Sequence, residues 1–245
     1  MKLMTHVVVG YPSLAMTRKI ALLMAKEGAD FLELQIPFSD PLGDGSTIRR
    51  ANSQSLDNGI QVRDAFLLAR RLIKRDRIKI PILFMTYFNI PFTYGVEKFC
   101  KDANNAGVSG LLIPDYNLDM ESDDKLEYHA KKNNLALIRF ISLDSDAGRI
   151  AFLTKNARGF LYCFSTQGIT GQRRHLDQRI FKRLRDLKKH TDLPLAVGFG
   201  ISTSEHIRAL RGKADIAVVG SALLRAFNDG GLEALERKMI ELVKS

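Results

Sequence analysis

Short apolar runs alternate with longer amphipathic segments from one end of the chain to the other. Eight runs have the length of a buried strand, at residues 6–9, 31–35, 80–85, 110–113, 136–140, 159–162, 195–197 and 215–219. Nearly continuous apolar strands separated by helices indicate a parallel sheet that is covered on both faces. Eight such units in one uninterrupted series predict an α/β fold, a closed (β/α)8 TIM barrel, rather than an open sheet.

The segment between the first two runs carries the clearest helix signals. Ser13 is placed to cap the helix, Met16, Ile20 and Leu23 share one face, and Gly28 ends it. The chain has 245 residues, which a single barrel commonly reaches. Because no linker or low-complexity segment divides it, we expect one domain over residues 1–245.

Composition excludes several classes of protein. No apolar run approaches the roughly 20 residues of a membrane helix, and the first residues lack a signal-peptide pattern, so we expect a cytoplasmic protein. Cys100 and Cys163 form no CxxC pair and are expected to be packing residues. The net charge of +10 is densest at residues 172–190, where the spacing indicates the solvated face of a helix. Without a nucleic-acid motif, the charge favours attraction of a phosphate ligand.

The stretch LELQIPFSDPLGDG, residues 32–45, places Glu33 in the middle of a strand. Strand alternation puts Phe31 and Gln35 on the same side as Glu33 and the flanking leucines on the other, so we expect Glu33 inside the barrel. A buried carboxylate either finds a partner or takes up a proton, and a protonated carboxyl can serve as a general acid. The alternative is a structural ion pair with a basic residue of the core.

Two further acids, Asp40 and Asp44, follow in the loop after this strand. Both stand in ordinary turn sequences, Ser-Asp-Pro and Gly-Asp-Gly, so a plain turn role is open for each. Active sites of these barrels lie in the loops at the carboxyl ends of the strands. Asp44 is therefore a candidate for the site, whereas the turn interpretation is stronger for Asp40.

Glycine loops follow the last three predicted strands: STQGITG at 165–171, VGFGIS at 197–202 and VVGSAL at 218–223. Backbone N–H groups can approach an anion closely at glycine, and a short helix that begins at Ser221 adds its positive end. Barrels of this class commonly hold a phosphate after strands seven and eight. The pattern predicts a phosphorylated ligand.

Histidines and serines give no further site. His6 opens the first predicted strand, and His129, His175, His190 and His206 stand in helical contexts where we expect surface residues. No metal site is predicted from them. A serine nucleophile elbow is also missing from the sequence, which argues against nucleophilic hydrolysis.

With these motifs in this order, the chain resembles the α subunit of tryptophan synthase from about Val7 to its end. The resemblance implies a carbon–carbon lyase of tryptophan biosynthesis that cleaves indole-3-glycerol phosphate to indole and glyceraldehyde 3-phosphate by a retro-aldol step. It also implies no cofactor on this chain and a β subunit partner that uses pyridoxal phosphate. The two would form an α2β2 heterotetramer in which indole passes to the β subunit.

The resemblance also assigns residues. Glu33 matches the catalytic glutamate that protonates the indole ring at C3, and Asp44 matches the aspartate that accepts the indole N–H. Tyr162 matches an active-site tyrosine, and Phe199 an aromatic side chain that packs on the ligand. The phosphate and closing loops are matched by Thr170, Gly171, Gly200, Gly220 and Ser221.

Several positions depart from the family. Gln35 stands where glycine is usual and is expected beside Glu33, Ser46 replaces a proline just after Asp44, and a helix before the first strand is nearly absent. These departures leave a second hypothesis, a catalytically weakened α-like subunit that mainly activates the β subunit. A third is a sugar-phosphate isomerase or epimerase on the same barrel. Glu33 and Asp44 together argue against it, because such an enzyme needs no acceptor for a ring N–H.

Overall fold

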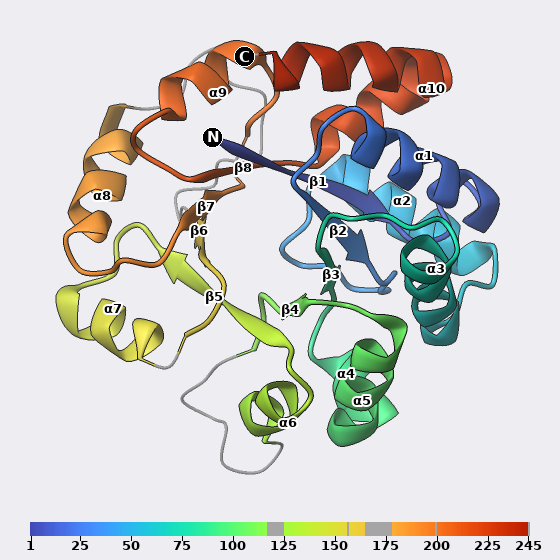
Figure 1. Cartoon of the computed structure of the whole chain (residues 1–245), viewed down its shortest axis with the longest axis horizontal. Coiled ribbons are helices and arrows are strands. Elements are labelled where there is room, and N and C mark those ends of the chain that lie inside the picture. The colour runs from blue at the N-terminus through green and yellow to red at the C-terminus, as the bar shows by residue number, and fades with distance from the viewer. Residues whose placement is uncertain (117–124, 156, 165–177, 199, 245) are drawn as a thin grey trace.

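Eight parallel strands close into a barrel in the order β1 to β8 (Figure 1). This is a computed structural model that describes residues 1–116, 125–155, 157–164, 178–198 and 200–244. Each strand pairs with the next along the chain, and β8 pairs with β1. The predicted (β/α)8 barrel is therefore confirmed. The strands are β1 Lys2–Val8, β2 Phe31–Gln35, β3 Ile82–Met85, β4 Gly110–Leu112, β5 Ala136–Ser142, β6 Leu161–Phe164, β7 Leu195–Val197 and β8 Ile216–Val219.

The helices surround the barrel (Figure 1). Those of the described residues are α1 Leu14–Lys26, α2 Ser46–Asp57, α3 Val62–Lys74, α4 Asn89–Tyr94, α5 Val96–Ala106, α6 Leu126–Lys132, α7 Ala147–Thr154, α8 Gln178–Lys188, α9 Ser204–Leu210 and α10 Ser221–Val243. α10 is kinked at Gly230 and Gly231, whose dihedral angles are not helical. None of these helices is long and apolar enough to span a membrane.

The first helix begins as its sequence predicts. The Ser13 side chain accepts a hydrogen bond from the Met16 N–H at 3.2 Å, which satisfies one backbone donor of the first turn. Gly28, just beyond the end, has a φ of +99° that glycine adopts readily. The buried face is centred on Ile20 and Met24, while Met16 and Leu23 are only partly buried. The predicted apolar stripe therefore lies at the margin of the true contact face.

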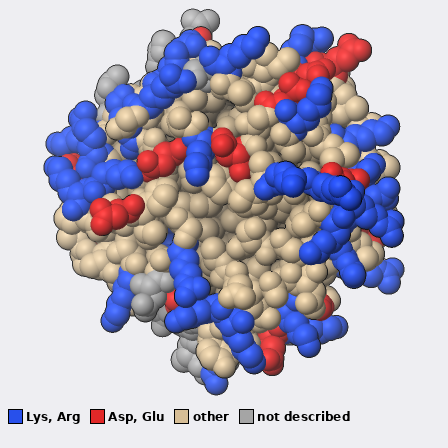
Figure 2. Space-filling view, viewed as in Figure 1, with Lys and Arg blue, Asp and Glu red and all other residues tan. Residues whose placement is uncertain are grey.

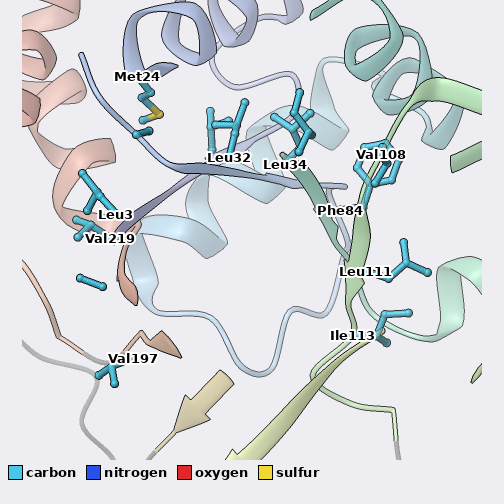
Figure 3. Packing of buried hydrophobic residues seen from close by; sticks show 14 of the residues in the cluster. Leu3, Met24, Leu32, Leu34, Phe84, Val108, Leu111, Ile113, Val197 and Val219 are labelled. Atoms are coloured by element: carbon cyan, nitrogen blue, oxygen red, sulfur yellow. The ribbon is translucent and has the colours of Figure 1, made fainter. Parts of the chain in front are cut away.

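Side-chain alternation divides the apolar core into two layers. Leu32, Leu34 and Phe84 belong to the layer between the strands and the helices, and Figure 3 shows them pointing out of the barrel. Phe31 instead lies inside, where its ring meets that of Phe160 edge-on at 5.9 Å. Burying one large apolar side chain stabilises the fold by roughly 1.5–3 kcal/mol. A register slip on β2 would forfeit this burial, so the leucines keep Glu33 and Gln35 inside.

Some predicted strand ends are wrong by a few residues. β1 begins at Lys2 rather than at residue 6, because residues 2–5 pair with β8 and close the barrel. β6 begins at Leu161 rather than at residue 159, since Gly159 has a φ of +82° that no strand residue adopts. The earlier start of β1 matters for the site, because it moves His6 from the edge of the sheet to its interior.

Cysteines and charges lie as predicted. Burial raises the pKa of the Cys100 and Cys163 thiols to about 12 each, as expected of packing residues. On α8, Ile180 and Leu184 are buried while most of its Lys and Arg are exposed. Figure 2 shows Lys and Arg distributed around the margin of one face, with acidic side chains among them. The predicted solvated helix face is confirmed for residues 179–188.

Candidate active site

Glu33 and Asp44 reach the same end of the barrel from one strand and the loop that follows it. Glu33 lies in β2 and is buried, with its side chain 6% exposed. After β2 the chain turns, with the Asp44 N–H donating to the Pro41 carbonyl at 3.0 Å, and Gly45 then caps α2. Asp40 is an exposed turn residue whose carbonyl accepts from the Leu42 N–H at 2.9 Å. The turn interpretation of Asp40 is thus supported, while Asp44 is placed toward the barrel.

Glu33 has a basic partner, His6 of β1. Nδ1 of His6 lies 2.9 Å from Oε1 of Glu33, and both side chains are 6% exposed. Burial by itself lowers the pKa of His6, but the charge and hydrogen bond of Glu33 outweigh burial and leave this pKa above its ordinary value. The sequence placed His6 at the start of the first strand and singled out no histidine, whereas the structure buries His6 within β1 against Glu33. Counting alternation back from Val8 through the strand would have placed His6 inside.

Gln35 and Asp44 form a second polar pair. The Gln35 Nε2 donates to Oδ2 of Asp44 at 2.6 Å, and Gln35 is fully buried. Burial raises the pKa of Asp44, and the hydrogen bond from Gln35 offsets part of that rise. The Tyr87 hydroxyl accepts from the Gly43 N–H at 3.1 Å and also interacts with Asp44. Gln35 thus stands beside Glu33 in the barrel, as predicted, and holds Asp44 as well.

Several buried polar atoms at this end have no partner among the described residues. They are Nε2 of His6, Oε2 of Glu33 and Oε1 of Gln35. Buried polar atoms are nearly always hydrogen-bonded, and each exception requires an explanation. Three such atoms on the neighbouring strands β1 and β2 indicate a place where a polar ligand would complete the bonding.

Tyr162 of β6 joins these acids from across the barrel. Burial, followed by the charges of Glu33 and Asp44, raises the pKa of its hydroxyl far above the ordinary value. The ring lies against Phe140 with centroids 4.8 Å apart. Gly198, just after β7, leaves room for it, because a Cβ there would lie 1.9 Å from the Tyr162 hydroxyl oxygen. Gly198 belongs to the predicted VGFGIS loop, but the need for glycine at this position comes from Tyr162 on the neighbouring strand.

The loop after β8 lies next to the same group. α10 begins at Ser221, as predicted, and a Cβ on Gly220 would lie 3.2 Å from Cβ of His6. Gly200, after β7, has a φ of +72°. The positive end of a helix and nearby glycine backbone suit an anion. Thr170, Gly171 and Phe199 lie outside the described residues, so their part of the predicted cradle stays a prediction.

Two of the other histidines, His129 and His206, differ from the surface residues that the sequence predicted, whereas His190 is exposed as predicted. His206 is 2% exposed, and its Nδ1 accepts from the Ser202 N–H at 3.3 Å. It is buried because α9 turns this side toward the core. His129 is half-buried, His190 is exposed and His175 lies outside the described residues. Across the part of the chain that is described, no cluster of three His, Cys, Asp or Glu residues could hold a metal ion.

Comparison with known proteins gives one consistent result. The family profile described as Tryptophan synthase alpha chain matches residues 1–244. The tryptophan synthase alpha chain of Desulfotalea psychrophila is 43% identical over 233 residues, 95% of this chain and 90% of the relative. That of Syntrophotalea carbinolica is 38% identical over 234 residues, 96% and 91% of the two chains. A solved tryptophan synthase structure from Mycobacterium tuberculosis has a TM-score of 0.91 at 30% identity, covering 99% and 91% of the two chains.

Proposed function

The chain belongs to the tryptophan synthase alpha chain family and is a lyase that cleaves indole-3-glycerol phosphate, and on this premise we propose which side chains carry the reaction. An isomerase or epimerase on the same barrel is not favoured, because the matches cover nearly the whole chain and name one family. The family works with a β subunit. What remains to be assigned is the role of each residue.

Glu33 is the acid and base of the cleavage. It gives a proton to C3 of the indole ring, which makes the bond from C3 to the glycerol chain breakable. It then takes the proton of the hydroxyl on the adjacent carbon, so that this oxygen becomes the aldehyde carbonyl of glyceraldehyde 3-phosphate. The electron pair of the broken bond returns to the ring as indole. The burial of Glu33 and its free Oε2 support this role.

Asp44 accepts the indole N–H and stabilises the positive charge that develops on the ring. Its position on the loop after β2, close enough to interact electrostatically with Glu33 and Tyr162, supports this role. Gln35 already donates to Oδ2 of Asp44, and a carboxylate can accept several hydrogen bonds. Asp44 can therefore accept the ring N–H as well, and Gln35 is compatible with turnover.

The phosphate binds the backbone of Gly200, Gly220 and Ser221, where α10 begins, together with the loop that carries Thr170 and Gly171. Tyr162 and Phe199 pack on the organic part of the substrate. This chain binds no cofactor of its own, and pyridoxal phosphate belongs to the β partner in an α2β2 complex. A cytoplasmic location, where the other steps of such a biosynthesis take place, stays a prediction.

The observation that carries the assignment is that buried Glu33 and partly buried Asp44 lie at one end of the barrel, beside three polar atoms that have no partner among the described residues. The test is indole formation from indole-3-glycerol phosphate by the chain alone and with a β subunit. We expect turnover in both, and faster turnover in the complex. If neither forms indole while the activity of the β subunit rises, the chain is the weakened activator instead.

A further inference from the structure

We propose that His6 is a positioning residue for Glu33, which stores the proton of the acid–base pair and presents one oxygen of Glu33 to the substrate. The inference rests on the proposed function, because it assigns a partner to the residue that cleaves the carbon–carbon bond. Nothing in the resemblance or the comparisons gives a role to position 6.

The geometry shows that His6 is not there for packing alone. Its imidazole is buried inside the barrel and its Nδ1 lies 2.9 Å from Oε1 of Glu33. A Cβ on Gly220 would lie 3.2 Å from the His6 Cβ, so the loop after β8 restricts the space on that side. An apolar side chain would fill this volume without the desolvation that a buried imidazole requires. The hydrogen bond also occupies Oε1, which leaves Oε2 as the free oxygen among the described residues.

The charges around His6 favour its protonated form. Glu33 faces it from β2, Asp44 acts on it from the loop after β2, and Gln35 lies nearby as a neutral polar side chain. β8, on its other side, consists of apolar residues from Ile216 to Val219. The remaining ionisable groups are tyrosines, Tyr162 across the barrel and Tyr87 beside Asp44. The two acids favour the charged imidazolium, and no other described cation lies at this end. His6 and Glu33 therefore form a pair that carries one proton.

The proton balance of a turnover closes on this pair. At rest His6 is an imidazolium and Glu33 a carboxylate. Loss of the Nε2 proton of His6 and protonation of Glu33 at Oε2 give a neutral imidazole, whose Nδ1–H still donates to Oε1, and a carboxylic acid that passes its proton from Oε2 to C3 of the indole ring. Glu33 then takes the hydroxyl proton as the carbon–carbon bond breaks. The pair ends with the one proton with which it began, and no other reactant is needed.

This arrangement predicts a specific pH dependence. The pair keeps one proton until the imidazolium titrates, and the pKa of His6 lies above its ordinary value. The general acid is therefore present at neutral pH because of His6. Without the imidazole, the rate should begin to fall at a lower pH as the pH is raised.

The test is the single-turnover rate of indole formation from about pH 5.5 to about pH 9 for the parent and for His6→Asn. The asparagine amide can still donate to Oε1 but stores no proton. We expect the alkaline limb of the variant to move down by at least about one pH unit, so that its deficit is at least about tenfold larger near pH 8 than near pH 6. His190→Asn, which removes an exposed imidazole, should leave the profile of the parent unchanged. A deficit of equal size at every pH would overturn the proposal.

A second measurement tests the proposal even if His6→Asn fails to fold. In the NMR titration of the parent, the His6 imidazole should titrate above its ordinary range, and Glu33→Gln should lower that pKa, because the opposing charge is gone. An unchanged His6 pKa in Glu33→Gln contradicts the pair. Failure of the proposed function looks different, since Glu33→Gln would then keep its activity. If Glu33→Gln loses activity while the pH–rate profile of His6→Asn runs parallel to that of the parent, the role of His6 is refuted and the role of Glu33 stands.

Discussion

Gly198→Ala is a sharp test of the packing that holds Tyr162 in the site. The added Cβ would lie 1.9 Å from the hydroxyl oxygen of Tyr162, 2.5 Å from Cζ and 2.8 Å from Cε1. Non-bonded heavy atoms rest at about 3.5 Å, so the ring must move by about 1.5 Å. It cannot move freely, because Phe140 lies against it with ring centroids 4.8 Å apart.

The size of the effect follows from this overlap. Overpacking of a filled site costs typically about 1–3 kcal/mol. If all of it is lost from transition-state stabilisation, kcat/KM falls by about 5- to 150-fold. Steady-state cleavage of indole-3-glycerol phosphate measures the loss. Gly148→Ala is the matched control, because its Cβ would meet nothing nearer than Oδ1 of Asp146 at 3.3 Å.

A double mutant separates this clash from a general effect of the loop. Tyr162→Phe removes the nearest atom, so Gly198→Ala should cost less in that background than in the parent, by at least about 0.5 kcal/mol. Equal losses in both backgrounds, or parent-like kinetics of Gly198→Ala, would refute the placement of the Tyr162 ring against Gly198.

Three further changes have defined outcomes. Asp44→Asn should lower the cleavage rate by about 10- to 1,000-fold, because the amide keeps an acceptor but lacks the charge, and it should raise the Tm, because burial disfavours the carboxylate in the fold. Phe84→Ala should lower the free energy of unfolding in urea by roughly 3–5 kcal/mol, since Phe84 is fully buried, with little change in kcat. The pKa of His6 is raised in the fold, so its pairing with Glu33 should stabilise the parent over His6→Asn most below pH 6.5, the ordinary pKa of histidine, and progressively less as the pH rises through the raised pKa. Urea unfolding at several pH values measures this, and a difference that grows with pH would contradict it.

The fold was accessible from the sequence because each strand carries its own signal. Leu32 and Leu34 flank Glu33, and this local alternation alone predicts which side chains enter the barrel. Ser13 and Ser221 likewise stand at helix starts that follow from neighbouring residues. Neighbouring residues in the sequence were enough to predict the strand alternation and the helix starts.

Contacts between strands were not accessible in the same way. His6 meets Glu33 on the neighbouring strand, and this pairing depends on the register between β1 and β2, which neither segment defines by itself. Gly198 owes its role to the ring of Tyr162 on the adjacent strand. The bond from Gln35 to Asp44 depends on the path of a loop. Such pairings arise only when the barrel closes, so no single segment of the sequence predicts them.

The single-turnover rate of indole formation by Glu33→Gln tests the central claim most directly. Gln keeps the shape of the side chain but cannot cycle a proton, so the rate should fall by at least about a thousandfold. Binding of an indolyl phosphonate, measured by calorimetry, should stay within about tenfold of the parent. A variant that cleaves within about tenfold of the parent rate would contradict the assignment of Glu33 as the acid and base of this barrel.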